Sequence, residues 1–162
     1  MPEVISNSSP LQYLYQTGLL DLMPALFRSV CVPEAVAAEL EEGRRRSVPL
    51  PTFEECSWLQ MMAVRDRTLL PLVTRLGDGE REVLALGLEL PGALLLLDDR
   101  DARRHGRALG LEISGTLGVL LLAKERGALD AVRPVLDRLQ ALRFRLDDRT
   151  RQIVLDLANE AA

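Results

Sequence analysis

The sequence predicts one α/β domain, residues 1–162, in which helices cover both faces of a mainly parallel sheet. Short apolar runs alternate with amphipathic segments of helical period along the whole chain, as in sheets whose strands are joined by helical crossovers. The run at 93–97 is apolar at every position, which is typical of a central parallel strand covered on both faces. The length suits a single domain, and no linker, repeat or low-complexity segment divides it.

Each element follows from its own residues. Apolar runs predict strands at 4–6, 30–32, 58–64, 93–97 and 111–114, with a short last strand at 143–146. Helical periodicity predicts helices at 10–17, 21–27, 34–42, 80–90, 100–109, 116–126, 130–142 and 148–159. Ser9 is expected to cap the first helix, with Pro10 at its first position, and Gly43 to end the third. The Gly-Asp-Gly sequence at 77–79 predicts a turn, and 44–55 a loop.

The composition excludes several classes of protein. With 48% hydrophobic and 27% charged residues, the chain is an ordinary globular protein rather than a disordered one. Cys31 and Cys56 are too few for a disulfide framework or a zinc ribbon, and a single histidine, His105, excludes a His-rich metal site. The longest uncharged apolar stretch, 113–123, is shorter than the roughly 18 residues of a spanning helix, and residues 1–10 lack a signal-peptide pattern. We expect a cytoplasmic protein with no membrane partner.

The charge balance bears on nucleic-acid partners. A net charge of −4 alone counts against such a partner, but a metal-dependent nuclease needs carboxylates in its site and cations only along the approach. Lys124 is the only lysine, and Arg suits bidentate phosphate contacts, although codon bias explains an Arg excess equally well. The aromatic content is only 4%, so we do not expect stacking platforms to dominate any nucleic-acid contact.

Polar side chains gather where the predicted strands end. Asn7 ends the first strand, and the adjacent pair Asp98 and Asp99 ends the run at 93–97. Thr116 follows the next strand after a short Ser-Gly connection. Ligands of open α/β sheets bind beyond the C-terminal ends of the strands, so these side chains are expected to share one site.

Three further acids are expected to approach the same edge. Glu80 and Glu82 open the helix after the Gly-Asp-Gly turn, and Glu39 lies on the inner part of the helix that leaves the second strand. Several carboxylates in one place repel each other unless a cation neutralises them. Oxygen-only ligands select Mg²⁺ or Mn²⁺, and such an ion promotes hydrolysis of phosphodiesters.

Each acid also has a purely structural interpretation. Asp99 is a natural cap for the helix that follows it, Glu39 a natural solvated residue of an amphipathic helix, and Glu82 a favourable charge at a helix N-terminus. One helix cap needs only one Asp, so two adjacent Asp residues indicate a further role. Glu80 lies on the inner side of its helix, which a purely solvated Glu would avoid.

With these residues in hand, the chain resembles PIN-domain proteins. It looks most like an uncharacterised bacterial and archaeal subfamily related to the VapC-type toxin nucleases, over residues 4 to about 146. The resemblance is carried by VISNSSPL (4–11), VPEAVAAEL (32–40), GEREVLAL (79–86), LLDDR (96–100) and GTLGVL (115–120).

The resemblance implies a three-layer α/β/α sandwich with a parallel sheet of about five strands, and a Mg²⁺- or Mn²⁺-dependent ribonuclease. Family members hold the metal with an acid at the end of the first strand, a Glu on the helix after the second, and one or two later acids. Carried over by position, the metal ligands are Asn7, Glu39, Glu80 or Glu82, and Asp98 or Asp99, and the catalytic acids are Glu39, Glu80, Asp98 and Asp99. Thr116 matches a polar residue that binds a water or phosphate.

Position 7 departs from the family pattern. The usual first-strand Asp is Asn7 here, which keeps an oxygen ligand but loses a negative charge and cannot act as a base. Two hypotheses therefore stay open. The chain is either a metal-dependent nuclease or a weakened or inactive PIN-like module that binds nucleic acid or protein.

Arginines on the helix after Asp99 suggest where substrate would bind. Arg100 and Arg104 share one face of that helix, and Arg103 and Arg107 another. Arg100 and Arg103 are our candidates for guiding an RNA backbone to the metal, and a solvated helix face is the alternative.

The resemblance also implies protein partners, because many VapC-type nucleases pair with an antitoxin and form homodimers. An exposed apolar face made by Leu11, Leu14, Leu19 and Leu22 would suit a homodimer, and the alternative is that these residues belong to the core. Asp residues at strand ends also occur in phosphoryl-acceptor domains, which is a third possible function. Such a domain also needs a lysine placed late in the chain, but the only lysine here, Lys124, lies in mid-helix.

Overall fold

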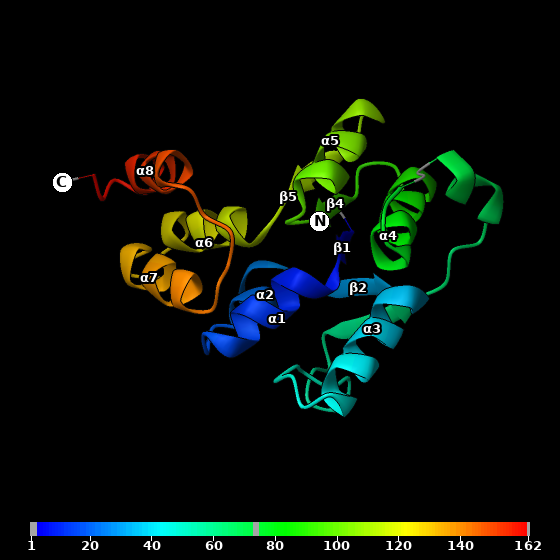
Figure 1. Ribbon diagram of the computed structural model, residues 1–162, viewed down its shortest axis with the longest axis horizontal. Coiled ribbons are helices and arrows are strands. Elements are labelled where there is room, and N and C mark those ends of the chain that lie inside the picture. The colour runs from blue at the N-terminus through cyan, green and yellow to red at the C-terminus, as the bar shows by residue number, and fades with distance from the viewer. Residues whose placement is uncertain (1–2, 73–74, 162) are drawn as a thin grey trace.

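A parallel sheet runs through the centre of the protein in the computed structural model, which describes residues 3–72 and 75–161 (Figure 1). The strands are β1 (Val4–Ser6), β2 (Val30–Pro33), β3 (Leu59–Met62), β4 (Leu94–Leu96) and β5 (Glu112–Ser114). They pair in the order β3-β2-β1-β4-β5, and every pair is parallel. This confirms the α/β prediction of about five parallel strands.

Helices flank the sheet and complete an α/β/α sandwich. They are α1 (Ser8–Gln16), α2 (Leu22–Leu26), α3 (Glu34–Arg45), the short 3₁₀ helix η1 (Arg67–Leu72), α4 (Asp78–Glu89), α5 (Arg100–Ala108), α6 (Thr116–Glu125), α7 (Arg133–Ala141) and α8 (Asp148–Leu157). Helix α4 packs against β1, β2 and β4 and contacts α3 and α5. Helix α6 contacts α1, α2 and α8, and Figure 1 shows α6, α7 and α8 grouped on one side.

The register of the sheet decides which residues meet at its C-terminal edge. Ser6 of β1 is paired with Leu96 of β4, and Leu96 in turn with Ser114 of β5. The residues that follow these three positions therefore leave the sheet side by side. Ile5 and Leu95 are fully buried at the centre, so apolar packing on both faces holds this register.

Three predicted boundaries and one predicted strand are wrong. Helix α1 begins at Ser8 with Asn7 as its N-cap, so Pro10 is its third residue, still within the first turn where no N–H is needed. Helix α3 continues through Gly43, where a Cβ atom would lie 2.4 Å from Leu50 Cδ1. That glycine makes room for Leu50 rather than ending the helix.

The other two corrections concern 77–79 and 143–146. Gly77 is the N-cap of α4, so Asp78 and Gly79 belong to its first turn rather than to a separate turn. Residues 143–146 form no strand, because Arg143 takes a positive φ of 68° just after α7 and reverses the chain there. The ring of Phe144 then packs edge-to-face on Tyr13, with centroids 4.9 Å apart.

The leucines considered for a dimer face belong to the core. Leu11 and Leu14 are fully buried, Leu22 is 6% exposed, and Leu19 packs against the core cluster. Those residues therefore cannot form an exposed dimer face. Among the helices that the structure describes, none is both long enough and apolar enough to cross a membrane.

Glu160 ties the three helices α6, α7 and α8 together. Its carboxylate accepts hydrogen bonds from the N–H groups of Val132 (2.7 Å) and Arg133 (3.1 Å) at the start of α7, and from Lys124 Nζ (2.9 Å) of α6. Burial alone would raise the pKa of Glu160, but these donors outweigh it and lower the pKa from 4.5 to about 2.

We expect Glu160→Gln to lower the free energy of unfolding by about 1–3 kcal/mol at pH 7, because hydrogen bonds to a charged acceptor are lost. The folded-state pKa lies below the unfolded value, so this stabilisation is complete above pH 4.5 and is lost as the pH falls towards 2. Urea unfolding at pH 7 and at pH 3 measures the effect. The exposed Glu125 of α6 offers the control Glu125→Gln, and an equal loss in both variants at every pH would contradict the prediction.

Candidate functional site

A cleft of about 880 Å³ opens beyond the C-terminal ends of the strands. It is bounded by α1, α5, the turn between β5 and α6, the connection 143–147 between α7 and α8, and Thr150 of α8. Asn7, Glu80, Asp98 and Asp99 line it. Four of the predicted metal ligands therefore share one cavity, which we call the strand-end cleft.

Asn7 begins helix α1 but does not cap it with its side chain. At an N-cap, an Asn side chain normally accepts a hydrogen bond from the first turn, yet the Asn7 side chain makes no such bond. Its backbone N–H donates to Leu96 O at 3.0 Å, which fixes it beside the end of β4. Its Oδ1 atom is buried and, within the described residues, has no hydrogen-bond partner. Such an orphaned oxygen costs about 1–3 kcal/mol, so a ligand that engages it gains that much.

Glu80 and Asp99 bring two carboxylates together. Glu80 Oε1 accepts from Gly77 N–H (3.3 Å) at the start of α4, whereas Oε2 is buried without a partner in the part of the chain that the structure describes. Asp99 caps α5, and its Oδ2 atom accepts from Ala102 N–H (3.0 Å). Burial raises the pKa of Glu80 most, followed by the charge of Asp99, whereas Gly77 N–H lowers it. The charge of Glu39 and a hydrogen bond that the protonated Glu80 carboxyl can donate to Asp99 add to the rise. A proton or a cation between the two carboxylates would relieve this repulsion.

Asp98 holds three elements at the cleft. Its Oδ1 atom accepts from Thr116 N–H (2.7 Å), and its Oδ2 atom accepts from Thr116 Oγ1 (2.7 Å) and Ser9 Oγ (2.9 Å). A Cβ atom on Gly115 would lie 2.7 Å from Asp98 Oδ1, so the close approach requires glycine there. Asp98 thus joins the end of β4 to the first turns of α1 and α6.

Thr116 lies behind Asp98 rather than on the lining of the cleft. Its side chain is fully buried, and its hydroxyl donates to Asp98 rather than facing the cleft. A fully buried group cannot touch substrate in this arrangement. In this arrangement the Thr116 hydroxyl orients Asp98, and its expected contact with a water or phosphate stays a prediction.

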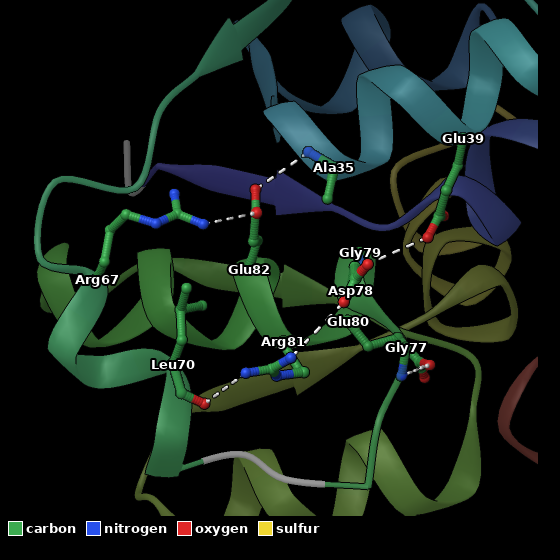
Figure 2. Close-up of polar contacts among 10 residues, drawn as sticks. All are labelled: Ala35, Glu39, Arg67, Leu70, Gly77, Asp78, Gly79, Glu80, Arg81 and Glu82. Atoms are coloured by element: carbon green, nitrogen blue, oxygen red, sulfur yellow. Dashed lines mark hydrogen bonds and ion pairs between the residues drawn. The ribbon is translucent and has the colours of Figure 1, made fainter.

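Glu39 lies next to the cleft rather than on its lining. Its Oε2 atom accepts from Ser8 Oγ. Its Oε1 atom accepts from Gly79 N–H at 3.2 Å, and Figure 2 shows this second contact. A Cβ atom on Gly79 would lie 2.6 Å from Glu39 Oε1, so glycine lets the carboxylate sit on the first turn of α4. Glu39 therefore adds negative charge beside Glu80 while both of its own oxygens are engaged.

Glu82 points away from this group. Its Oε1 atom accepts from Ala35 N–H (3.1 Å) at the start of α3, and its Oε2 atom lies 3.7 Å from Arg67 Nη2 (Figure 2). Its carboxylate caps a neighbouring helix and pairs with one cation. The structure does not bring Glu82 together with the other predicted ligands.

The two candidate arginines both line the cleft but differ in their contacts. Arg103 Nη1 donates to Leu97 O and Ser114 O, each at 2.9 Å, and so joins the ends of β4 and β5. Burial and the nearby Arg107 lower the pKa of Arg103, while Asp98 opposes the change. Arg100 is exposed, so its guanidinium is accessible from the cleft.

The acids do not by themselves complete a metal cage. Among residues 3–72 and 75–161, no three Asp, Glu, His or Cys side chains converge closely enough to hold an ion. Position 7 supplies an amide in place of a carboxylate, Glu39 is engaged by Ser8 and Gly79, and Glu82 faces α3. The amide oxygen of Asn7 is a further oxygen donor available in this cleft.

A donor set of Asn7, Glu80 and Asp99 fits a hard divalent ion. It contains only oxygen atoms, the ligands that Mg²⁺ and Mn²⁺ prefer. Two of those oxygens, Asn7 Oδ1 and Glu80 Oε2, are buried without partners in the described chain, and the Glu80 and Asp99 carboxylates repel each other. An ion bound by these oxygens would remove both the cost of the unpartnered buried atoms and the repulsion between the two carboxylates.

Several residues that shape the site were not anticipated. Ser8 and Ser9 orient Glu39 and Asp98, and Gly79 and Gly115 make room for the same two carboxylates. The segment 143–150 completes the cleft from far along the chain. The hydroxyls directly after Asn7 and the glycines beside each acid were the available signals, but nothing local in the sequence places 143–150 here.

Comparison with protein families agrees with this geometry. A family model described as a PIN domain matches residues 3–160, nearly the whole chain. No curated protein and no solved structure gives a match. PIN domains have a nuclease-type fold and generally depend on divalent metal ions. With its five-stranded parallel sheet flanked by helices, the chain belongs to the PIN-domain family.

Proposed function

We propose that this protein is a divalent-metal-dependent ribonuclease whose ion is held in the strand-end cleft by Asn7, Glu80 and Asp99. One observation carries the proposal: two buried oxygens, Asn7 Oδ1 and Glu80 Oε2, lack partners in the described residues and belong to the same cleft as Asp99. Mg²⁺ or Mn²⁺ supplies the polarisation of phosphate and the activation of water that phosphodiester hydrolysis needs.

The protein's own residues support such a site in distinct ways. Gly77 N–H fixes one oxygen of Glu80, and Ala102 N–H fixes one oxygen of Asp99, so each carboxylate keeps a second oxygen for the cleft. Asp98, whose oxygens accept three hydrogen bonds, keeps the strand end and the two helix starts in register. Glu39 strengthens the negative potential that attracts a cation.

Cleavage of a fluorescent single-stranded RNA tests the proposal directly. We expect cleavage with Mn²⁺ and none in EDTA, and Glu80→Gln or Asp99→Asn should abolish it. Cleavage that survives EDTA or both substitutions would refute the metal-dependent mechanism.

A second candidate function is a binding module without catalysis. Asn7 favours it, because the site lacks a carboxylate that the family resemblance implies, and because no three acids converge in the described residues. Asn7→Asp separates the two functions. A weak natural nuclease should gain Mn²⁺ affinity and cleavage by more than the roughly 10-fold that a change in an outer-shell partner brings, because Asn7 is proposed to touch the ion itself. A protein that binds RNA without metal, and stays inactive with Asp at position 7, is a binding module.

The resemblance to VapC-type nucleases supports a finer role as the toxin of a toxin–antitoxin pair that acts as a homodimer. Expression should then arrest growth, and Glu80→Gln should relieve the arrest. Light scattering should give twice the mass of one chain. Normal growth together with a monomeric mass would contradict the toxin role. The proposed ribonuclease activity would still be tested separately by the cleavage assay.

A further inference from the structure

An aromatic pair lies in the strand-end cleft and has no part in the proposed metal site. Tyr13 of α1 and Phe144 of the connection between α7 and α8 line the cleft, with ring centroids 4.9 Å apart and planes at 90°. Both side chains are only partly buried. The chain has just six aromatic residues, and two of them meet in this cleft, where each packs against the core but keeps part of its side chain exposed.

Arginines line the same cleft as this pair. Phe144 lies between Arg143 and Arg145, and Arg100 and Arg107 of α5 line the same cleft. All four arginines are exposed. In the described residues none of the four lies within 4 Å of a carboxylate, whereas Arg104 on α5 pairs with Asp101.

The connection between α7 and α8 has the geometry to present these side chains. Arg143 takes a left-handed backbone conformation, with φ of 68°, and Phe144 N–H donates to Leu139 O at 2.9 Å. These features end α7 and fix the start of the connection, which Figure 1 shows in orange between α7 and α8. Asp147 caps α8 by accepting from Thr150 N–H at 2.7 Å, which fixes its other end.

We propose that Phe144, supported by Tyr13, is a stacking subsite for an unpaired base of the nucleic-acid strand, and that Arg143 and Arg145 hold the phosphates beside that base. This inference rests on the proposed function, because it assumes that a strand enters the cleft that carries Asn7 and Glu80. In an edge-to-face pair the edge of one ring covers only part of the other ring, so ring surface remains for a base. A base lies flat on such a ring only when it has left a duplex, so the subsite selects single strands.

The alternative role for Phe144 is to anchor the connection to the core, where any apolar side chain of similar size would serve. Phe144→Leu keeps an apolar anchor but removes the stacking face, and Phe144→Trp keeps both. Binding of a short single-stranded RNA that carries 2-aminopurine, measured in EDTA by anisotropy and by quenching, separates the two roles. Circular dichroism confirms that each variant is folded.

We expect Phe144→Leu to weaken binding about 5- to 100-fold and to abolish quenching, because stacking on one aromatic side chain contributes that much. Phe144→Trp should restore both signals. Arg143→Gln and Arg145→Gln should weaken binding and reduce the salt dependence by about 0.7 in log–log slope for each lost phosphate contact. Arg104→Gln, on the same helix as Arg100 but paired with Asp101, is the control and should bind like the wild type.

Wild-type affinity and quenching in Phe144→Leu would overturn the inference, and so would failure of the wild type to bind the RNA. Cleavage in Mn²⁺, measured separately, keeps this result distinct from the proposed function. Binding that depends on Phe144 without any cleavage refutes the nuclease and supports the subsite. Cleavage together with RNA binding that does not depend on Phe144 refutes only the subsite.

Discussion

Glu80→Gln should abolish Mn²⁺-dependent cleavage and at the same time stabilise the metal-free protein. The loss of activity should exceed the roughly 10- to 100-fold that removal of an outer-shell partner costs, because Glu80 is proposed to touch the ion itself. The gain in stability follows from the raised pKa of Glu80, which burial and Asp99 cause. Gln keeps an oxygen for Gly77 N–H and can donate its amide to Asp99.

The sign of the stability effect follows from linkage. A carboxyl whose pKa is higher in the folded state than in the unfolded chain destabilises the fold when it is ionised. The advantage of Glu80→Gln should therefore be present near pH 7 and disappear as the pH falls below the raised pKa of Glu80. Thermal unfolding in EDTA at several pH values measures it.

Glu82→Gln is the matched control, since Glu82 lies two residues away on the same helix but caps α3 and faces Arg67. It should keep cleavage and lose a little stability, about 0.5–1 kcal/mol, with the loss of the charge on the cap. Equal loss of cleavage in both variants would contradict the assignment of Glu80 alone to the site.

Asp98→Ala should be the most destabilising single substitution at the cleft, by about 3–5 kcal/mol. It removes one acceptor that serves the N–H and hydroxyl of Thr116 and the hydroxyl of Ser9, and it leaves the Thr116 groups buried without a partner. Asp98→Asn should cost less, because an amide oxygen can still accept one of these bonds. Urea unfolding of both variants measures the difference.

Thr116→Val and Thr116→Ser separate the hydroxyl from the rest of that side chain. Thr116→Val should lower the free energy of unfolding by about 1–2 kcal/mol, whereas Thr116→Ser, which keeps the hydroxyl, should lower it by less than half of that.

The Asp98→Ala variant has an outcome that would contradict its structural role. If it is stable and fully folded and has lost only its Mn²⁺ affinity, Asp98 is a metal ligand rather than a structural acceptor.

The fold could be predicted from local patterns because those patterns repeat along the chain. Continuous apolar runs such as 93–97 and the helical period of the segments between them specify a parallel sheet with helical crossovers, and both are present. The errors occurred where the packing or backbone conformation of a single residue overrides the local pattern. Gly43 looks like a helix end but makes room for Leu50, and 143–146 looks like a strand but reverses at Arg143.

The location of the site was predictable, but the orientation of each side chain was not. Strand order places Asn7, Asp98 and Asp99 at one edge, which follows from the general rule for parallel sheets. Whether Glu80 or Glu82 faces the cleft depends on the rotation of α4 against α3, and two residues along a helix point about 200° apart. The arginines and Phe144 of 143–145 come to the cleft through tertiary packing alone.

A crystal structure with Mn²⁺ tests the central claim most directly. The account predicts one anomalous peak in the strand-end cleft, about 2.0–2.4 Å from Asn7 Oδ1, Glu80 Oε2 and an oxygen of Asp99, and no peak in crystals of Glu80→Gln. A peak held by Glu39 or Glu82 instead, or an empty cleft at saturating Mn²⁺ in a protein that still cleaves RNA, would contradict it.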